Sequence, residues 1–309
     1  MEDYPKTLME FESRFSTEEA CVDYLVQIRW PDGFVCPSCD GRKAWRTERM
    51  LFHCAGCGRQ VSVTAGTIFQ GTRKPLQMWF RAMWWVTSQK NGASAKGLQQ
   101  SLGLGSYQTV WAWLHKLRRA MVRPGRDQLS GLVEVDETYV GGPEERPGRG
   151  AEEKTLVVIA VEKHGRTLGR TRMAVVSEAS RDELCGFVER CVATGSTVRT
   201  DGWKSYRTLK DRGYVHERVL QQRSTQEPTE LLPGGHRIAS LLKRWLLGTH
   251  QGAVSRAHLP YYLDEFTFRF NRRKSKARGK LFFRLVEHAL AVDPAPYNTL
   301  IKPQHIVST

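Results

Sequence analysis

Two groups of side chains in this 309-residue chain have types and spacing that suit metal ions. The first group is a pair of Cys-x-x-Cys motifs with 14 residues between them, formed by Cys36, Cys39, Cys54 and Cys57. A two-residue gap lets both sulfurs of a pair reach one ion, and four thiolates complete a closed tetrahedron around zinc. A closed site leaves no coordination position for a substrate, so the spacing predicts structural zinc in preference to a disulfide or a redox pair. His53 adjoins Cys54 and is interpreted as a bystander.

The second group consists of two aspartates in strand-like runs. Asp136 lies within Leu132–Val140, whose apolar residues indicate a buried strand, and Asp201 follows the run Thr197–Thr200. A buried carboxylate needs a compensating partner, and a metal ion is one such partner. Aspartates at the ends of neighbouring strands can face one point, where two divalent ions about 3.5–4 Å apart support phosphodiester chemistry. Either aspartate, taken alone, could equally be a cap at the end of a strand and bind no metal. Glu137 is expected on the opposite face of the strand, because successive side chains alternate.

The composition narrows the class of partner. Lys and Arg number 47 against 32 Asp and Glu, which gives a net charge of +15 and favours polyanions such as nucleic acid. No run approaches the roughly 20 apolar residues that span a bilayer, and the acidic start lacks the order of a signal peptide. We therefore expect a cytoplasmic protein without a membrane segment, associated with the nucleoid when it binds DNA. Three further cysteines, expected to be reduced core residues, are Cys21, Cys185 and Cys191.

The predicted elements divide the chain into the regions of an α+β multidomain protein. Ser16 and Glu19 form a capping box that opens a helix ending near Pro31, and the alternating stretch Gln60–Phe69 indicates short strands beside the cysteines. An amphipathic helix follows from Pro75. The expected regions are an N-terminal helix (1–30), a zinc ribbon (31–72), a helix-turn-helix-like region (73–124), a domain of strands and helices (128–290) and a loose C-terminal tail (291–309).

Residues 94–121 have the length and the central glycine turn of a helix-turn-helix. The second helix begins after the capping residue Ser106 and would place its first residues in a major groove. A helical connector that binds no DNA would show the same caps and apolar face, and the tryptophans of this region are expected in the core. The residues predicted to contact base edges are Tyr107, Gln108 and Thr109, and those predicted to contact phosphates are Lys116, Arg118 and Arg119.

A different pattern begins at residue 132. Three strand-like runs, a helix and a fourth strand that ends in an aspartate favour a mixed sheet with helices against it. The polar segment 141–154, rich in glycine and proline, is predicted to be a mobile hairpin loop. From Ile238 the chain is helical again, with a second long helix around Leu259–Asn271. The runs that make the sheet are the strands 132–140, 155–162, 170–176 and 197–200, with the helix at 181–193.

Four motifs carry a resemblance to a known family: LVEVDETYVGG, VRTDGWKSY, HRIASLLKRWLLGTHQGAVS and HLPYYLDEFTFRFNRRKS. Together with the preceding four-cysteine ribbon, they resemble the zinc-ribbon insertion-sequence transposases of the IS1595 group, which are DDE-type and ISXO-like. The resemblance covers the chain from about residue 16 to 290. It implies an RNase H-like catalytic domain behind a DNA-binding ribbon, and a DNA transposase that acts on the terminal inverted repeats of an insertion sequence.

The resemblance assigns the first two catalytic acids to Asp136 and Asp201. The third metal ligand of the family precedes a basic residue by seven positions, which leads back from Lys243 to His236. Seven residues make two helical turns, so the histidine can face the metal while the lysine faces a DNA phosphate. DDE-type enzymes commonly carry glutamate at this position, although the histidine resembles a variant of this group. The remaining candidates for the third ligand are Glu230, Asp264 and Glu265.

The expected cofactors are structural Zn2+ and catalytic Mg2+ or Mn2+. Imidazole suits borderline metals better than magnesium, so activity is expected to be higher with manganese. The expected partner is double-stranded DNA, both the inverted repeats and a target. A homodimer or a larger synaptic assembly is expected because two transposon ends must be held together.

A basic run near the end of the chain, together with Arg244, is expected to bind the DNA backbone. Two other functions stay open. One is a DNA-binding regulator with an inactive catalytic remnant, and the other is a nuclease that hydrolyses DNA without joining it. The run consists of Arg269, Asn271, Arg272, Arg273, Lys274, Lys276, Arg278 and Lys280.

Overall fold

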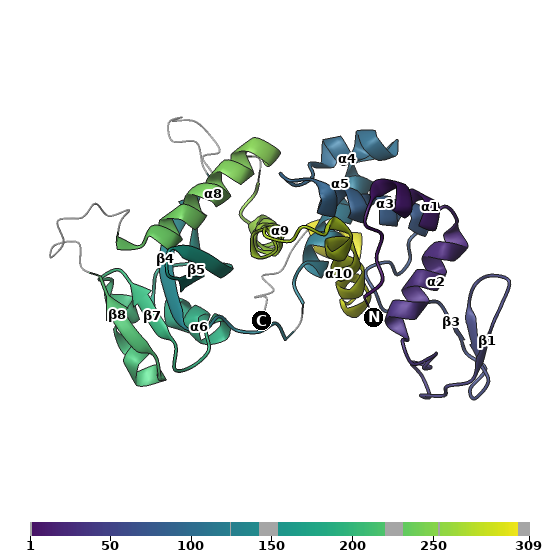
Figure 1. The fold of residues 1–309 in the computed structure, drawn as a ribbon, viewed down its shortest axis with the longest axis horizontal. Coiled ribbons are helices and arrows are strands. Elements are labelled where there is room, and N and C mark those ends of the chain that lie inside the picture. The colour runs from purple at the N-terminus through teal and green to yellow at the C-terminus, as the bar shows by residue number, and fades with distance from the viewer. Residues whose placement is uncertain (1, 124, 142–153, 220–230, 253, 302–309) are drawn as a thin grey trace. The chain divides into compact units, whose positions relative to one another are not determined.

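The computed structural model describes residues 2–123, 125–141, 154–219, 231–252 and 254–301 (Figure 1). The chain divides into two compact units, of which the first contains Met1–Arg123 with Ser275–Ile301 and the second contains Pro124–Lys274. Within the described part, no helix has both the length and the apolar character needed to cross a bilayer. Most of the predicted loop 141–154 and the end of the predicted tail, from residue 302, lie outside the described residues.

The first unit is built mainly from helices. Predicted capping at Ser16 is one residue early, because the side chain of Thr17 accepts the hydrogen bond from the backbone N–H of Ala20 at 3.1 Å. The predicted loose tail is wrong for its middle part, where a short helix buries Leu300. The helices of this unit are α1 (Leu8–Arg14), α2 (Glu18–Arg29), α3 (Leu76–Ser88), α4 (Ala95–Leu102), α5 (Tyr107–Ala120), α10 (Arg278–Ala291) and α11 (Tyr297–Ile301).

Helix α10 returns to the first unit from the far end of the sequence, so the boundary predicted at residue 290 is wrong and lies instead near 274. Helix α10 belongs to the first unit because its apolar face packs against helices α2 and α3. The ring of Phe282 lies 5.6 Å from Phe80 of α3 and 6.2 Å from Tyr24 of α2, measured between ring centroids. The tryptophans were predicted to lie in the core, and this is confirmed for Trp79 and Trp113. Both are buried, and their rings stack with centroids 4.0 Å apart.

The predicted ribbon contains a small antiparallel sheet in the order β1-β2-β3. Its strands are β1 (Ala44–Arg46), β2 (Phe52–Cys54) and β3 (Gln60–Val61). The strand pairing expected as far as Phe69 stops at Val61, and the next apolar residues are buried in turns. These turns tuck Val63 and Ile68 into the core without ladder hydrogen bonds.

The second unit contains the predicted mixed sheet, with strand order β6-β5-β4-β7-β8. Strands β4, β5 and β6 are antiparallel neighbours, whereas β7 runs parallel to β4 and β8 runs parallel to β7. The last strand was not predicted from the sequence. The bounds are β4 (Leu132–Val140), β5 (Thr155–His164), β6 (Thr167–Val176), β7 (Thr197–Thr200) and β8 (Val215–Arg218).

Helices cover both faces of this sheet (Figure 1). Helix α6 (Arg181–Cys191) and the 3-10 helix η1 (Lys204–Arg212) pack on one face, and α8 (Pro233–His250) and α9 (Leu259–Asn271) pack on the other. Side chains alternate along β4, so Val135 faces α6. Asp136 pairs with Ile159, which belongs to the α8 side, and its carboxylate therefore faces α8.

Candidate zinc centre and candidate active site

The four cysteines of the ribbon converge. Their sulfur atoms all lie within 4.8 Å of one another, and among the described residues they are the only group of three or more metal-ligating side chains that does so. The sulfurs of Cys36 and Cys57 are 3.7 Å apart, and those of Cys39 and Cys54 are 3.6 Å apart. A tetrahedron with zinc–sulfur bonds of about 2.3 Å has edges of about 3.8 Å. The four residues therefore fit a structural zinc ion, as the spacing predicts.

The chain around the sulfurs has the form that zinc knuckles need. Backbone N–H groups of Ser38 and Cys39 lower the pKa of the Cys36 thiol to about 6, which favours the thiolate that binds metal. A side chain at Gly41 would place its Cβ 3.3 Å from two sulfurs, so the glycine keeps the knuckle open. His53 instead stacks on Trp45 with ring centroids 4.3 Å apart, which confirms it as a bystander.

The two aspartates lie at matching positions of neighbouring parallel strands, Asp136 within β4 and Asp201 directly after the end of β7. Glu134 pairs with Arg199 in the register of β4 and β7, and Asp136 and Asp201 each lie two residues further on. The Asp136 side chain is largely buried, with 12% exposed, and its Oδ1 accepts from the backbone N–H of Glu137 at 3.0 Å. Asp201 is exposed just beyond its strand. The strand ends thus carry both acids to one edge of the sheet.

A histidine lies beside Asp136 at this edge. His236, in the first turn of α8, has its Nδ1 3.6 Å from Oδ2 of Asp136. Burial raises the pKa of the Asp136 carboxyl, the imidazole of His236 lowers it, and the carboxylate of Asp201 raises it again, with a raised value as the result. A buried acid beside a second acid lacks positive charge, which a divalent cation would supply. Carboxylate oxygens and one imidazole form a donor set that fits Mn2+ or Mg2+.

The ligand atoms of Asp136, Asp201 and His236 do not all lie within 4.8 Å of one another. Two ions about 3.5–4 Å apart have partly separate ligands, so such a site does not require convergence on one point.

Of the other candidates for the third metal ligand, Glu265 is buried and pairs with Arg269 at 2.8 Å, as expected for a structural ion pair. Asp264 lies on the same helix, where burial raises its pKa to about 7 and Arg126 lowers it. The last candidate, Glu230, lies outside the described residues.

Glu137 points away from this edge, as the strand alternation predicts. Its Oε1 accepts a hydrogen bond from the hydroxyl of Tyr206, a residue of η1 on the α6 side of the sheet. Burial raises the pKa of Glu137 to about 7, the bond from Tyr206 lowers it, and the carboxylates of Asp201 and Asp136 raise it. Glu137 is therefore excluded from the ligands that face α8.

Sequence reasoning missed Glu134, which lies two residues before Asp136 on the same strand face. It is completely buried, and its carboxylate binds the first backbone N–H groups of α8. A second acid at the same-face position of an apolar strand was the available sign. The two glycines directly before His236, Gly234 and Gly235, were another.

Helix α8 also carries the predicted basic residues. It begins at Pro233, five residues before the start predicted at Ile238, so it carries His236 as well as Lys243, as the seven-residue spacing requires. Lys243 and Arg244 are exposed, with charges available to a DNA backbone. Their contact with phosphate stays a prediction.

The α4–α5 segment keeps its predicted first contacts exposed. Gly103 adopts a left-handed conformation with φ of 62°, and the Ser106 side chain accepts from the backbone N–H of Thr109 at 3.3 Å. Tyr107, with 47% exposed, and Gln108 are both accessible at the start of α5, while Thr109 is half-buried.

The basic residues further along α5 differ from the prediction. Arg118 is only 2% exposed, so the predicted phosphate contact is wrong for this residue. The reason is that α5 is covered by α10 and α11, which return from the end of the chain. Lys116 is half-buried, with its Nζ 6.0 Å from the ring centroid of Trp79, and burial lowers its pKa. Arg119 is half-buried.

The predicted basic run is divided between the two compact units. Its members up to Lys274 belong to the second unit, and those from Lys276 belong to the first. Several members have structural contacts, which the prediction of DNA binding did not include. The Asn271 amide accepts from the backbone N–H of Thr171 at 2.7 Å and donates to its carbonyl at 3.1 Å, fastening α9 to the edge strand β6. Lys280 pairs with Glu2 at 2.8 Å.

Two of the arginines of this run lie over aromatic rings. Arg272 lies 4.1 Å from the ring centroid of Phe268, and Arg273 lies 3.9 Å from that of Phe270. Arg273 also donates to the carbonyl oxygen of Gly169 at 3.2 Å, so part of its hydrogen-bonding capacity is used within the protein. It remains exposed, and its charge remains available to DNA.

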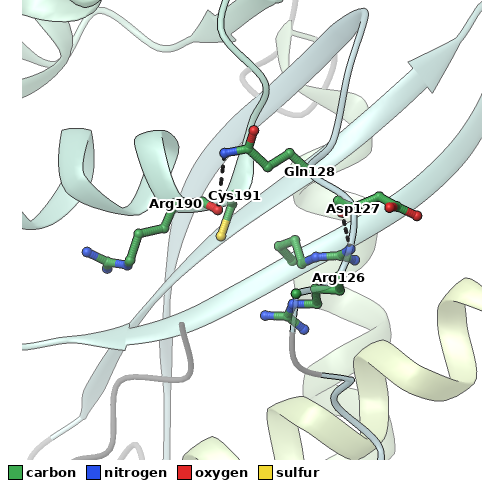
Figure 2. Close-up of a pocket in the computed structure, with 7 residues that line it drawn as sticks. Arg126, Asp127, Gln128, Arg190 and Cys191 are labelled. Carbon is green, nitrogen blue, oxygen red and sulfur yellow. Dashed lines mark hydrogen bonds between the residues drawn. The ribbon is translucent and has the colours of Figure 1, made fainter.

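A cavity of about 230 Å³ lies elsewhere in the second unit (Figure 2). Arg172, one of its lining residues, pairs with Ala160 in the sheet and so shares the α6 face, opposite to Asp136. Its guanidinium donates to the carbonyl oxygen of Asp127 at 2.8 Å, which secures the cavity wall. Cys191 lines the same cavity and is half-buried, whereas the other two non-ribbon cysteines are buried as predicted. The cavity is separate from the carboxylate edge.

Comparisons with known proteins find family models for two parts of the chain. Residues 128–271 match the model of the ISXO2-like transposase domain, and residues 16–60 match that of the transposase zinc-ribbon domain. The chain is 29% identical over 282 residues to an uncharacterized protein in transposable element ISH50 of Halobacterium salinarum, covering 82% of this chain and 91% of that protein. A crystal structure of a pre-cleavage Mos1 transpososome is 14% identical, with 69% of this chain and 78% of that chain covered and a TM-score of 0.27.

Proposed function

Because the chain belongs to the IS1595 family of insertion-sequence transposases, we propose that it cuts DNA at the terminal inverted repeats of an insertion sequence and joins the ends to target DNA. The observation that carries the proposal is the carboxylate edge. Asp136 and Asp201 lie at matching positions of adjacent parallel strands, with His236 3.6 Å from the first. The strand order β6-β5-β4-β7-β8, with three antiparallel strands followed by two parallel ones, supports an RNase H-like fold for this unit.

The residues of this edge have distinct roles in the proposed reaction. Asp136, Asp201 and His236 would hold divalent cations, and these cations would activate the attacking oxygen and stabilise the departing one. The fixed N–H bonds to the Asp136 and Asp201 carboxylates orient their free oxygens. Lys243, two helical turns after His236, is exposed to hold a backbone phosphate. Water would cut the strand and leave a 3′-hydroxyl. This hydroxyl would then attack a phosphodiester of the target DNA and displace the 3′-oxygen of the target strand, without a covalent link to the protein.

DNA recognition is assigned to the first unit. The exposed Tyr107 and Gln108 open α5, which acts as the recognition helix of a helix-turn-helix with α4. The ribbon and the net charge of +15 supply sequence-independent attraction to the backbone. Two transposon ends require at least two copies of this recognition surface, so a homodimer or a larger assembly is the proposed active form.

A strand-transfer assay with labelled inverted-repeat DNA tests the proposal. Asp136→Ala and Asp201→Ala should abolish both cutting and joining while DNA binding persists. The matched control is Asp211→Ala, an exposed acid ten residues after Asp201 on η1, which should keep full activity. Cut but unjoined DNA would identify a nuclease, and binding without any cutting by the unaltered chain would identify a regulator.

A further inference from the structure

The first turn of α8 is held by a carboxylate from the strand below it. Glu134 of β4 is completely buried, and its Oε2 accepts from the backbone N–H groups of Gly234 at 2.6 Å and Gly235 at 3.2 Å. These N–H groups have no partner inside their own helix, and they carry the positive end of its dipole. A buried acid on β4 therefore serves as the cap that α8 does not obtain from its own preceding residue, Leu232.

The two glycines allow an approach that other residues would prevent. A Cβ on Gly234 would lie 2.5 Å from Oε2 of Glu134, and a Cβ on Gly235 would lie 2.7 Å from the Cβ of Asp136. A Cβ carbon does not come this close to another heavy atom unless something shifts. The helix backbone thus lies directly on the two acids of the strand, one glycine over each acid.

This close contact fixes the next residue along the helix. His236 follows Gly235, and its position in the helix is secured by the bond from its N–H to the carbonyl of Leu232 at 3.1 Å. Its Nδ1 then lies 3.6 Å from Oδ2 of Asp136. A shift of the first turn by one side-chain thickness would move the imidazole away from the carboxylate.

The other oxygen of Glu134 shows that the arrangement is costly. Oε1 has no hydrogen-bond partner among the described residues, and its nearest cation is the Nζ of Lys163 at 3.7 Å. A partly unsatisfied buried carboxylate is an expensive way to cap a helix. Helix α3 shows the cheaper form, in which the half-buried Glu18 accepts from the N–H groups of Leu76 and Gln77 without any glycine.

We infer that Glu134, together with Gly234 and Gly235, is a positioning device that holds the imidazole of His236 against Asp136 as the third metal ligand. The inference rests on the proposed function, in which Asp136 binds a divalent cation. Glu134 acts through the helix and contacts neither the cation nor DNA. The same carboxylate that caps α8 therefore determines where the last ligand lies.

The test measures Mn2+ binding to the zinc-loaded full chain by electron paramagnetic resonance. Glu134→Ala and Gly235→Ala should each weaken binding about tenfold or more, the range seen when the groups that orient a ligand are removed. Glu134→Gln keeps an oxygen acceptor for the two N–H groups and should restore most of the affinity. The matched control is Glu18→Ala, which removes the equivalent cap from α3 and should leave Mn2+ affinity unchanged.

A double-mutant cycle separates positioning from general damage. In a His236→Ala background, Glu134→Ala should cause no further loss of Mn2+ affinity, because the ligand that it positions is gone. An equal loss in both backgrounds, or unchanged affinity in Glu134→Ala itself, would overturn the inference. If Gly235→Ala does not fold, the Glu134 variants decide alone. If the proposed function itself is wrong, the result is different: Asp136→Ala would then leave Mn2+ binding unchanged.

Discussion

The two candidate metal sites of this chain are built in opposite ways. In the ribbon, four sulfurs from two short knuckles lie within 4.8 Å of one another, and the set is closed. In the second unit, Asp136, Asp201 and His236 come from β4, the end of β7 and the start of α8, and their ligand atoms do not all meet within that distance. A closed set stabilises the fold, whereas an open one leaves room for reacting oxygens.

The two sites differ in what fixes the positions of their ligand atoms. The ribbon needs little more than its own turns, because each cysteine pair is fixed by two intervening residues. The carboxylate edge depends on the register of β4 and β7 and on the seating of α8 by Glu134. Substitutions at the zinc ribbon should therefore impair folding, whereas substitutions at the carboxylate edge should impair the reaction and leave the fold intact.

The largest expected effect is loss of the ribbon fold on removal of zinc. Structural zinc contributes about 10–16 kcal/mol in small zinc-binding peptides. Cys39→Ser, or a strong chelator, should release one zinc per chain and expose the backbone amides of β1 and β2 to hydrogen exchange. Amides of β4 and β5 in the second unit should keep their protection. Protected β1 and β2 amides in the metal-free chain would remove the structural role of the site.

The next effect is loss of chemistry without loss of fold. Asp201→Asn keeps the shape of an exposed side chain but removes its charge, so strand transfer should fall by about 10³-fold, as when one preorganised electrostatic group is removed. The melting temperature should stay within experimental error of the unaltered chain. A large drop in melting temperature would show that Asp201 is a structural cap like those that end many strands.

A smaller effect is expected on the choice of metal. Imidazole favours manganese over magnesium, and a carboxylate reduces that preference. His236→Glu should therefore narrow the ratio of strand-transfer rates in Mn2+ and Mg2+, while zinc content is unchanged. An unaltered ratio would mean that the imidazole does not bind the catalytic cation and that another group, such as Asp264, is the third ligand.

The smallest expected effect concerns phosphate contact beside the open site. Lys243→Ala should weaken DNA binding and reduce the slope of log affinity against log salt by about 1, the value for one lost phosphate contact. Arg118→Gln is the matched variant, and its slope should not change because Arg118 is buried. Equal slopes for Lys243→Ala and the unaltered chain would remove Lys243 from the DNA surface.

The same contrast explains which features could be predicted from the sequence. Cysteine spacing is local, so all four zinc ligands followed from it. The helix of Lys243 was predicted too, but its start was placed at Ile238, whereas the structure begins it at Pro233 and so includes His236. Burial of Arg118 could not be predicted, because α5 is covered by helices that begin more than 150 residues later. The cap from Glu134 to Gly234 joins residues 100 positions apart and was equally hidden. Helix periodicity predicts which residues share a face but does not identify what covers it.

The central claim is that Asp136, Asp201 and His236 bind a divalent cation at the edge of the sheet, apart from the zinc ribbon. Replacing the catalytic cation with Fe2+ and adding peroxide cuts a protein backbone near the bound iron, so the fragments report the site directly. The account predicts cuts near residues 136, 201 and 236 in the zinc-loaded chain, all lost in Asp136→Ala. Cuts at other places, or the same cuts in Asp136→Ala, would contradict it.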